Sequence, residues 1–222
     1  MSTDADRNVA WAYYHRGLEY SRLGQHGDAI ADFTESLRLD PSAWWVYMSR
    51  GTAHFDLGDY AQAIEDLTAA IRLDPEAADA YNERGRALSA QGEYERAIDD
   101  FALAIRLEPD SPWAYNNRAL AYGALGDYEK SMADHNEVVR LRPEEAWAYG
   151  SRAITHHERG DYEQAITDLT EAIRLDPTSV EAYNRRGWAH AALGDHQRAI
   201  ADYTEAIKLG TSNPGAEVNA AQ

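Results

Sequence analysis

Arginine and aspartate recur at a fixed interval along the chain and are its most regular charged groups. The arginines are Arg16, Arg50, Arg84, Arg118, Arg152 and Arg186, and the aspartates are Asp32, Asp66, Asp100, Asp134, Asp168 and Asp202. A row of guanidinium groups could bind the carboxylates of a ligand. The alternative, which we favour, is a structural ion pair. A glycine lies midway between each arginine and the next aspartate, so two antiparallel helices joined there would place the charges opposite each other.

Histidines are the other residues whose chemistry could serve catalysis or metal binding. His54, His156 and His190 recur at one position of the repeating unit, His135 falls at a core position, and His157 follows His156. Adjacent side chains on a helix point about 100° apart, which suits joint metal ligation poorly. Neither a His-Glu-x-x-His pattern nor clustered carboxylates accompany them, and the chain has no cysteine. We therefore expect packed or surface histidines, with no metal, no other cofactor and no catalytic residues, so the chain is not predicted to be an enzyme.

The charge balance narrows the class of partner. The 222 residues carry 38 acidic and 21 basic side chains, for a formal net charge of -17. Such a chain repels the phosphates of nucleic acids and the surface of anionic membranes. No run of about 18 apolar residues is present, and the first residues, Met-Ser-Thr-Asp-Ala-Asp-Arg, are polar. We expect a soluble, cytoplasmic protein that binds neither nucleic acid nor membrane.

The regular charges belong to a unit of 34 residues that repeats without insertion or deletion. Its markers are glycines at Gly24, Gly58, Gly92, Gly126, Gly160 and Gly194 and prolines at Pro41, Pro75, Pro109, Pro143 and Pro177. A period of this length predicts a solenoid, in which each unit buries its apolar face against its neighbours. Within a unit, the glycine ends a first helix, and a second helix follows with apolar residues three and four apart.

The predicted organisation is six helix-turn-helix repeats between two short terminal segments. The repeats occupy residues 10–43, 44–77, 78–111, 112–145, 146–179 and 180–209. Residues 1–9 form an N-terminal extension that lengthens the first helix backwards from a cap at Thr3 or Asp4. Residues 210–222 form a disordered tail.

Local departures from the repeat modify these expectations. An acidic residue after the turn glycine can cap the second helix at Asp59, Glu93, Asp127, Asp161 and Asp195. Each recurring proline suits a first helical position. The first repeat has Gln25, His26 and Gly27 there, so its second helix should begin poorly. The fourth repeat has Ser131, His135 and Val138 at core positions, so we expect it to be the most weakly packed.

The recurring residues resemble those of the tetratricopeptide repeat family. With each unit numbered from 1 to 34, the resemblance rests on Tyr at position 4, Gly or Ala at 8, Gly at 15, Tyr at 17, Ala at 20, an aromatic residue or Leu at 24, Ala at 27 and Pro at 32. It covers residues 10–209. The resemblance implies an all-α, right-handed α-solenoid of antiparallel helix pairs. First helices would line a concave groove and second helices would face outward. It also implies protein binding or scaffolding without catalysis.

By this resemblance, a set of first-helix positions faces the groove. The residues there are Trp11, Tyr14, Leu18, Trp45, Met48, Phe55, Asp79, Asn82, Arg86, Trp113, Asn116, Asn117, Leu120, Trp147, Ile154, His157, Asn184 and Trp188. Four tryptophans fall on one row, where solvated surfaces gain little from indoles, so the row favours ligand binding. Each indole could instead lie flat against the next first helix and stiffen the stack. Both interpretations stay open.

The remaining groove residues indicate the chemistry of a ligand. Asp79, Asn82 and Arg86 would form a polar centre between two apolar zones. In the family, first-helix asparagines hold the main chain of bound peptides, and Asn117 lies at that position, with Asn82, Asn116 and Asn184 one residue earlier. Members that bind acidic chaperone tails use groove lysines, but the two lysines here, Lys130 and Lys208, fall on second helices.

The sequence therefore predicts a non-enzymatic protein–protein interaction scaffold. Its partner would be a peptide or protein segment with apolar anchor side chains, neutral or basic in charge. The alternative is a structural protein that dimerises or stacks through its terminal repeats. The last second helix presents Ile200, Tyr203 and Ile207 with no following repeat to cover them, so a homodimer through the C-terminal repeat is a further expectation.

Overall fold

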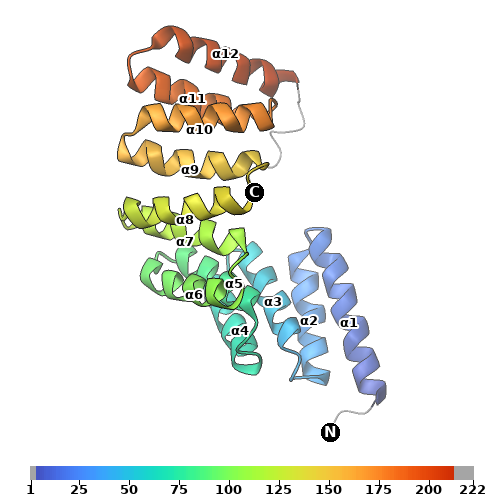
Figure 1. The fold of residues 1–222 in the computed structure, drawn as a ribbon. Coiled ribbons are helices and arrows are strands. Elements are labelled where there is room, and N and C mark those ends of the chain that lie inside the picture. Colours follow the sequence, from blue (N-terminus) through green and yellow to red (C-terminus); the bar gives the residue numbers. More distant parts are fainter. Residues whose placement is uncertain (1–3, 213–222) are drawn as a thin grey trace. The chain divides into compact units, whose positions relative to one another are not determined.

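The computed structural model describes residues 4–212 and contains, within them, twelve helices and no strands. The first helices of the hairpins are α1 (Asp4–Arg22), α3 (Trp44–Asp56), α5 (Ala78–Ala90), α7 (Pro112–Ala124), α9 (Ala146–Arg159) and α11 (Val180–Ala192). The second helices are α2 (His26–Leu39), α4 (Tyr60–Leu73), α6 (Tyr94–Leu107), α8 (Tyr128–Leu141), α10 (Tyr162–Leu175) and α12 (His196–Ser212). The fold is thus an all-α solenoid of helix-turn-helix repeats (Figure 1).

The chain divides into two compact units. The first ends at Ala121 and the second begins at Tyr122, so the division falls inside α7. In the first unit, α1 to α6 pack in chain order, each helix against the next. In the second unit, α8 to α12 do the same (Figure 1). No helix among residues 4–212 is long and apolar enough to cross a membrane.

Glycine makes the turn inside each hairpin possible. All six turn glycines have positive φ angles, between 71° at Gly24 and 82° at Gly58 and Gly160. A side chain with a Cβ is strained in this left-handed conformation, whereas glycine adopts it freely. The recurring glycines therefore end each first helix at the same repeat position.

The positions of the recurring prolines and the hydrogen bonds of the acidic residues differ from the sequence prediction. The recurring prolines lie in the turns between hairpins, ahead of the next helix, instead of at its first position. Among the acidic residues after the turn glycines, Asp127 and Asp195 accept a hydrogen bond from a backbone N–H of the first helical turn. Asp59, Glu93 and Asp161 make no such cap. Asp161 instead lies 3.1 Å from Arg159, so its charge is paired with a side chain.

Close packing inside a hairpin brings a small residue of the first helix against a large residue of the second. A Cβ added to Gly85 would lie 2.6 Å from Cε1 of Phe101, which is itself 1% exposed. Gly17 and Phe33 repeat this contact in the first hairpin. The rings therefore rest directly on the opposing helix backbone, and the core consists of alanines between layers of larger side chains.

Ion pairs join the two helices of five hairpins. Their members are Arg16–Asp32, Arg50–Asp66, Arg84–Asp100, Arg152–Asp168 and Arg186–Asp202. In each pair, Nε and Nη2 of the arginine donate to the two carboxylate oxygens, as in Arg84–Asp100. The aspartates are buried. A buried carboxylate is costly to keep charged unless a cation pairs with it, and the arginine provides that cation. The pairing of Arg118 with Asp134 stays a prediction.

The fourth repeat contains a buried polar cluster. Ser131, His135 and Val138 are each at most 1% exposed, and the weak packing expected of this repeat stays a prediction. The Ser131 and Thr155 hydroxyl oxygens lie 2.8 Å apart, and Nδ1 of His135 lies 2.9 Å from the same Thr155 oxygen. These contacts satisfy the two hydroxyl groups and Nδ1 of His135, which would otherwise be costly to bury, whereas Nε2 of His135 is buried without a hydrogen-bond partner. Burial lowers the pKa of His135 to about 4.

The two ends of the chain differ from the predicted bounds. Helix α2 begins at His26 and has the same 14-residue length as α4, although Gln25 provides no side-chain cap. The helix thus begins at the same repeat position as α4 without a cap, and its poor start stays a prediction. Helix α1 begins at Asp4, and α12 runs on to Ser212, so residues 210–212 are helical. The predicted cap at Thr3 and the rest of the predicted tail, 213–222, lie outside the described residues.

Candidate functional site

Two adjoining cavities lie between α9 and α11 in the second unit. Their volumes are about 230 Å³ and about 400 Å³. Both are lined by Leu169 of α10 and Arg185 of α11, so together they form one elongated depression. We call this depression the α9–α11 cleft. Its walls come from the two first helices, and α10 supplies the floor.

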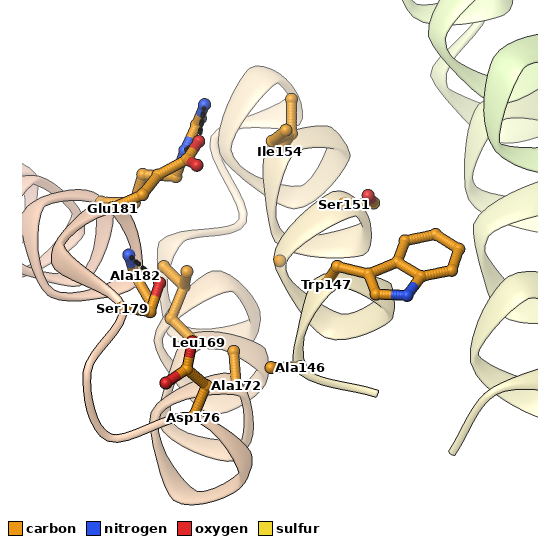
Figure 2. A pocket seen from close by; sticks show the side chains of 12 residues that line it. Ala146, Trp147, Ser151, Ile154, Leu169, Ala172, Asp176, Ser179, Glu181 and Ala182 are labelled. Atoms are coloured by element: carbon orange, nitrogen blue, oxygen red, sulfur yellow. Dashed lines mark hydrogen bonds and ion pairs between the residues drawn. The ribbon is translucent and has the colours of Figure 1, made fainter. Parts of the chain in front are cut away.

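The smaller cavity is built from short side chains. Figure 2 shows Ser151 and Ile154 along α9, Glu181 and Ala182 opposite them, and Leu169 with Ala172 below. Gly150 also lines this cavity, and the space where its Cβ would be is empty to 4 Å. Trp147 belongs to the lining, but its indole extends away from Glu181 and Ala182 (Figure 2). Small side chains facing each other leave room for the backbone of an extended segment.

The larger cavity has an aromatic wall. The rings of His157 and Trp188 have centroids 3.6 Å apart at 46°. Tyr162 lies edge-on to both, 5.5 Å from Trp188 and 5.7 Å from His157. Two neighbours thus hold the indole of Trp188 in place, while 44% of this residue remains exposed. The arrangement presents a fixed apolar surface beside a cavity large enough for a side chain.

The charges of the cleft largely compensate each other. Nε of Arg185 donates a hydrogen bond of 2.8 Å to Oε1 of Glu181. Burial, together with the positive charge of Arg185, lowers the pKa of His157. The imidazole is therefore neutral at neutral pH. In a chain of net charge -17, the cleft is a place where an apolar side chain meets little excess charge.

The equivalent location in the first unit contains a polar network. Arg86 occupies the repeat position of Trp188, and its guanidinium lies 4.5 Å from the ring centre of Phe55. Nη1 of Arg86 donates to Glu83 at 2.6 Å, and Nδ2 of Asn82 donates to Glu83 at 3.3 Å. Burial raises the pKa of Glu83, against the opposing effect of Arg86. The same repeat positions therefore carry an aromatic cavity in one unit and an ion pair in the other.

The four groove tryptophans divide into two groups. Trp11, Trp45 and Trp113 are 65%, 42% and 57% exposed, whereas Trp147 is half-buried. The ring of Trp11 stacks on His15 of its own helix, and Trp45 meets its neighbour Trp44 edge-on. Each of these ring contacts joins two residues of the same helix, so neither is a contact with the next first helix.

The groove asparagines are partly used by the protein itself. Nδ2 of Asn117 donates a hydrogen bond of 3.0 Å to Oδ1 of Asn82, which links α7 to α5 within the first unit. Oδ1 of Asn116 is buried and has no hydrogen-bond donor. Asn184 is exposed at the rim of the larger cavity. Of the four asparagines, Asn184 is the one placed beside the α9–α11 cleft.

Other groove candidates contribute to the core as well as to the surface. Tyr14 and Leu18 pack against the core cluster of the first two hairpins. Met48 and Phe55 pack against Leu67 and Ala87 in the first unit. Asp79 and Leu120 are exposed, and Ile154 is half-buried in the smaller cavity. The cleft thus unites Trp147, Ile154, His157, Asn184 and Trp188 from the predicted set.

Comparison with known families decides the classification of the chain. Three models described as tetratricopeptide repeat match it, over residues 48–112 and 151–214, over 110–178, and over 10–43. The chain belongs to the tetratricopeptide repeat family. The matching models describe this repeat itself. None of the curated proteins matches the sequence.

Solved structures share the tetratricopeptide repeat fold. A repeat protein from Parabacteroides merdae has a TM-score of 0.77 and 19% identity, over 90% of this chain and 80% of its own. YrrB, described as having an unusual peptide-binding site, has a TM-score of 0.62 and 18% identity, over 80% and 91%. The first repeat domain of Spaghetti (RPAP3), bound to the HSP90 peptide SRMEEVD, has a TM-score of 0.53 and 28% identity, over 54% and 95%.

Three histidines of this tetratricopeptide repeat chain lie close to the aspartates of its hairpin ion pairs. Nε2 of His54, His156 and His190 lies 3.7 to 4.0 Å from Asp66, Asp168 and Asp202 respectively. These are the aspartates of the hairpin ion pairs. Within residues 4–212, no group of three or more His, Asp or Glu side chains is arranged to hold a metal ion.

Sequence reasoning missed several residues of the cleft. Ser151 and Arg185 lie at a first-helix position expected to face the groove, and that position could have revealed them. Glu83 occupies the same position in the first unit. Leu169 and Tyr162 are on a second helix, and the tetratricopeptide repeat pattern assigns such residues to the core and outer face. No signal in the sequence marks them as cleft residues.

Proposed function

We propose that the chain is a protein-interaction module that binds a partner segment in the α9–α11 cleft. The observation that carries the proposal is the exposed Trp188, held by His157 and Tyr162 beside a cavity of about 400 Å³. Held aromatic side chains next to pockets are typical energetic centres of protein interfaces. Membership of the tetratricopeptide repeat family supports a peptide or protein segment as the ligand, as do the peptide-binding site described for YrrB and the peptide bound to the Spaghetti domain.

The cleft favours an extended segment with a large apolar anchor. The anchor enters the larger cavity against Trp188, while the neighbouring backbone crosses the smaller cavity above Gly150 and Ser151. The amide of Asn184 at the rim can hydrogen-bond the main chain of the segment. In this arrangement, the side chain provides affinity and the backbone contacts set the register.

The ligand carries a neutral or basic charge. The Spaghetti domain binds an acidic peptide, but both lysines of this chain, Lys130 on α8 and Lys208 on α12, lie on second helices away from the cleft. Arg185 is the cation of the cleft lining, and Glu181 already neutralises it. A segment rich in carboxylates would therefore meet a chain of net charge -17 without a free lysine to bind it.

A selection from a displayed library of random linear peptides tests this proposal. The full chain should enrich peptides with a large aliphatic or aromatic residue and few acidic residues. The same selection with Trp188→Ala should lose these peptides, and a selection with Leu193→Ala, which changes an exposed residue outside the cleft, should retain them. Enrichment that is identical for the wild type and Trp188→Ala would place the binding surface elsewhere.

A further inference from the structure

A recurring hydrogen bond connects four of the hairpins to the one before each, whereas Ala102 offers no side-chain acceptor at this position of α6. Besides its bonds to aspartate, the hairpin arginine donates from Nη1 to a side chain of the preceding second helix. Arg50 donates to Thr34 at 3.0 Å, Arg84 to Thr68 at 3.1 Å, and Arg186 to Thr170 at 3.1 Å. Arg152 donates to the oxygen of Asn136 at the same repeat position, also at 3.1 Å. This contact is therefore a standard part of the interface between consecutive repeats.

The two ends of the described chain carry the two halves of this contact. On α12, Thr204 stands where Thr170 stands on α10, and it likewise donates to the carbonyl four residues earlier at 2.7 Å. No arginine from a following repeat reaches it among residues 4–212. On α1, Arg16 binds Asp32, but its side chain is 59% exposed, against 20% for Arg84. Arg16 is exposed because no second helix precedes α1 in the described chain.

The apolar surfaces around these two residues are complementary in the same way. Ile166 and Ile173 of α10 pack against the cluster that contains Ala182 and Ala189 of α11. Their equivalents on α12, Ile200 and Ile207, are 64% and 66% exposed. On α1, Ala12 is exposed, although the equivalent Ala182 is 6% exposed in α11. Helix α12 thus presents the kind of surface on which a following first helix packs. Helix α1 presents most of the surface with which a first helix packs on it.

One position at each end carries a polar side chain where other repeats carry an alanine or a tyrosine, and the carboxylate of Glu19 is paired with Arg22 of its own helix. The first helices α3, α5 and α11 carry buried Ala53, Ala87 and Ala189 at a position where α1 carries exposed Glu19. At the start of the second helix, α12 has exposed His196 in place of the tyrosine of α4, α6, α8 and α10. Both positions border one core region between consecutive repeats, because Tyr94 packs against the cluster that contains Ala121. A carboxylate and an imidazole therefore replace an alanine and a tyrosine.

We propose that α1 of one copy of this protein docks on α12 of a second copy and continues the stack of repeats. In this contact, Arg16 donates to Thr204, Ala12 lies over Ile200 and Ile207, and Glu19 faces His196. Helix α1 begins earlier in its repeat than the other first helices, at Asp4, and α12 ends later than the other second helices, at Ser212. Both extensions are compatible with this contact, because no loop has to connect two separate copies. A contact between two different surfaces leaves both outer ends free, so the assembly grows beyond a dimer.

Analytical ultracentrifugation of the full chain at increasing concentration tests the contact. The mass of the wild type should rise through dimer to larger species. Ile200→Lys blocks one end and Ala12→Lys the other, and both residues are exposed, so the fold should persist. Each variant alone should be a monomer. Gln164→Lys, which adds the same charge to an exposed site on α10, should assemble like the wild type.

Mixing the two blocked variants distinguishes this contact from a symmetric one. Each variant retains the end that the other lacks, so an equimolar mixture should form dimers and nothing larger. A wild type that stays monomeric throughout would overturn the proposal. Dimers formed by Ala12→Lys alone would overturn it as well, because α12 would then pair with another α12.

Discussion

Arg84 and Asp100 join the two helices of one hairpin through two parallel hydrogen bonds of 2.7 Å. The carboxylate is buried, and the arginine side chain is 20% exposed. Truncating one partner of a buried pair leaves the other charge without compensation, at a cost of about 3–5 kcal/mol. Arg84→Ala should therefore reduce the free energy of unfolding, measured by urea denaturation, by about this amount.

Arg86 provides the control for this prediction, since it lies two residues away on the same helix. Its partner Glu83 is on its own helix, and its side chain is 37% exposed. The carboxylate of Glu83 is 20% exposed, so Arg86→Ala should cost more than the loss of a surface pair, about 0.2–1 kcal/mol, but less than Arg84→Ala, whose partner carboxylate is 6% exposed. Equal losses for Arg84→Ala and Arg86→Ala would show that the interhelical pairs do not stabilise the hairpins in the way their burial indicates.

Helical glycines with different surroundings should respond in opposite directions to the same substitution. In Gly85→Ala, the new methyl group meets the ring of Phe101 at 2.6 Å, and overpacking of this kind typically costs about 1–3 kcal/mol. In Gly150→Ala, the methyl group enters open space, and the gain in helix propensity is up to about 1 kcal/mol. Thermal unfolding followed by circular dichroism should show a lower midpoint for the first and a higher one for the second. A destabilised Gly150→Ala would mean that the cleft is narrower than described.

His135 should make the folded protein sensitive to mild acid. Its pKa is about 4 in the folded chain, against an ordinary value of 6.5. Between these values the unfolded chain binds a proton that the folded chain does not, so stability is full above about 6.5 and falls as the pH decreases toward 4. The loss attributable to this group approaches about 3 kcal/mol.

The variant His135→Leu isolates that contribution. Leucine occupies the same repeat position at Leu67 and Leu169, both buried, and it does not titrate. The free energy of unfolding of His135→Leu should decline less steeply than that of the wild type between pH 6.5 and pH 4. Parallel profiles for the two proteins would show that the imidazole is already protonated, or accessible to water, in the folded state.

The sequence predicts the hairpins well because their determinants are local and periodic. Gly58 and its equivalents mark the turns, and the equal spacing of Arg50 and Asp66 about Gly58 is enough to predict their pairing across antiparallel helices. The terminal bounds are less predictable. Gly210 suggested an end to the last helix, but the helix continues to Ser212.

The cleft depends on relationships that no single position reveals. Trp188 and Arg86 share a repeat position, and both were expected in the groove. Only the structure shows that Arg86 bonds to Glu83, while Trp188 lies beside a cavity. Similarly, Ser131 and His135 resemble core defects when considered one at a time. Thr155, from the next hairpin, supplies the hydrogen-bonding partner for both.

The affinity of a selected peptide for wild-type protein and for Trp188→Ala tests the central claim most directly. If the α9–α11 cleft binds the anchor side chain, Trp188→Ala should weaken binding by about 2 kcal/mol or more, which is roughly thirtyfold. Leu193→Ala should bind as the wild type does, and the helical signal and melting temperature of Trp188→Ala should remain close to those of the wild type. Unchanged affinity for Trp188→Ala, or early melting of that variant with full binding below its transition, would contradict the claim and show that the indole is a packing residue.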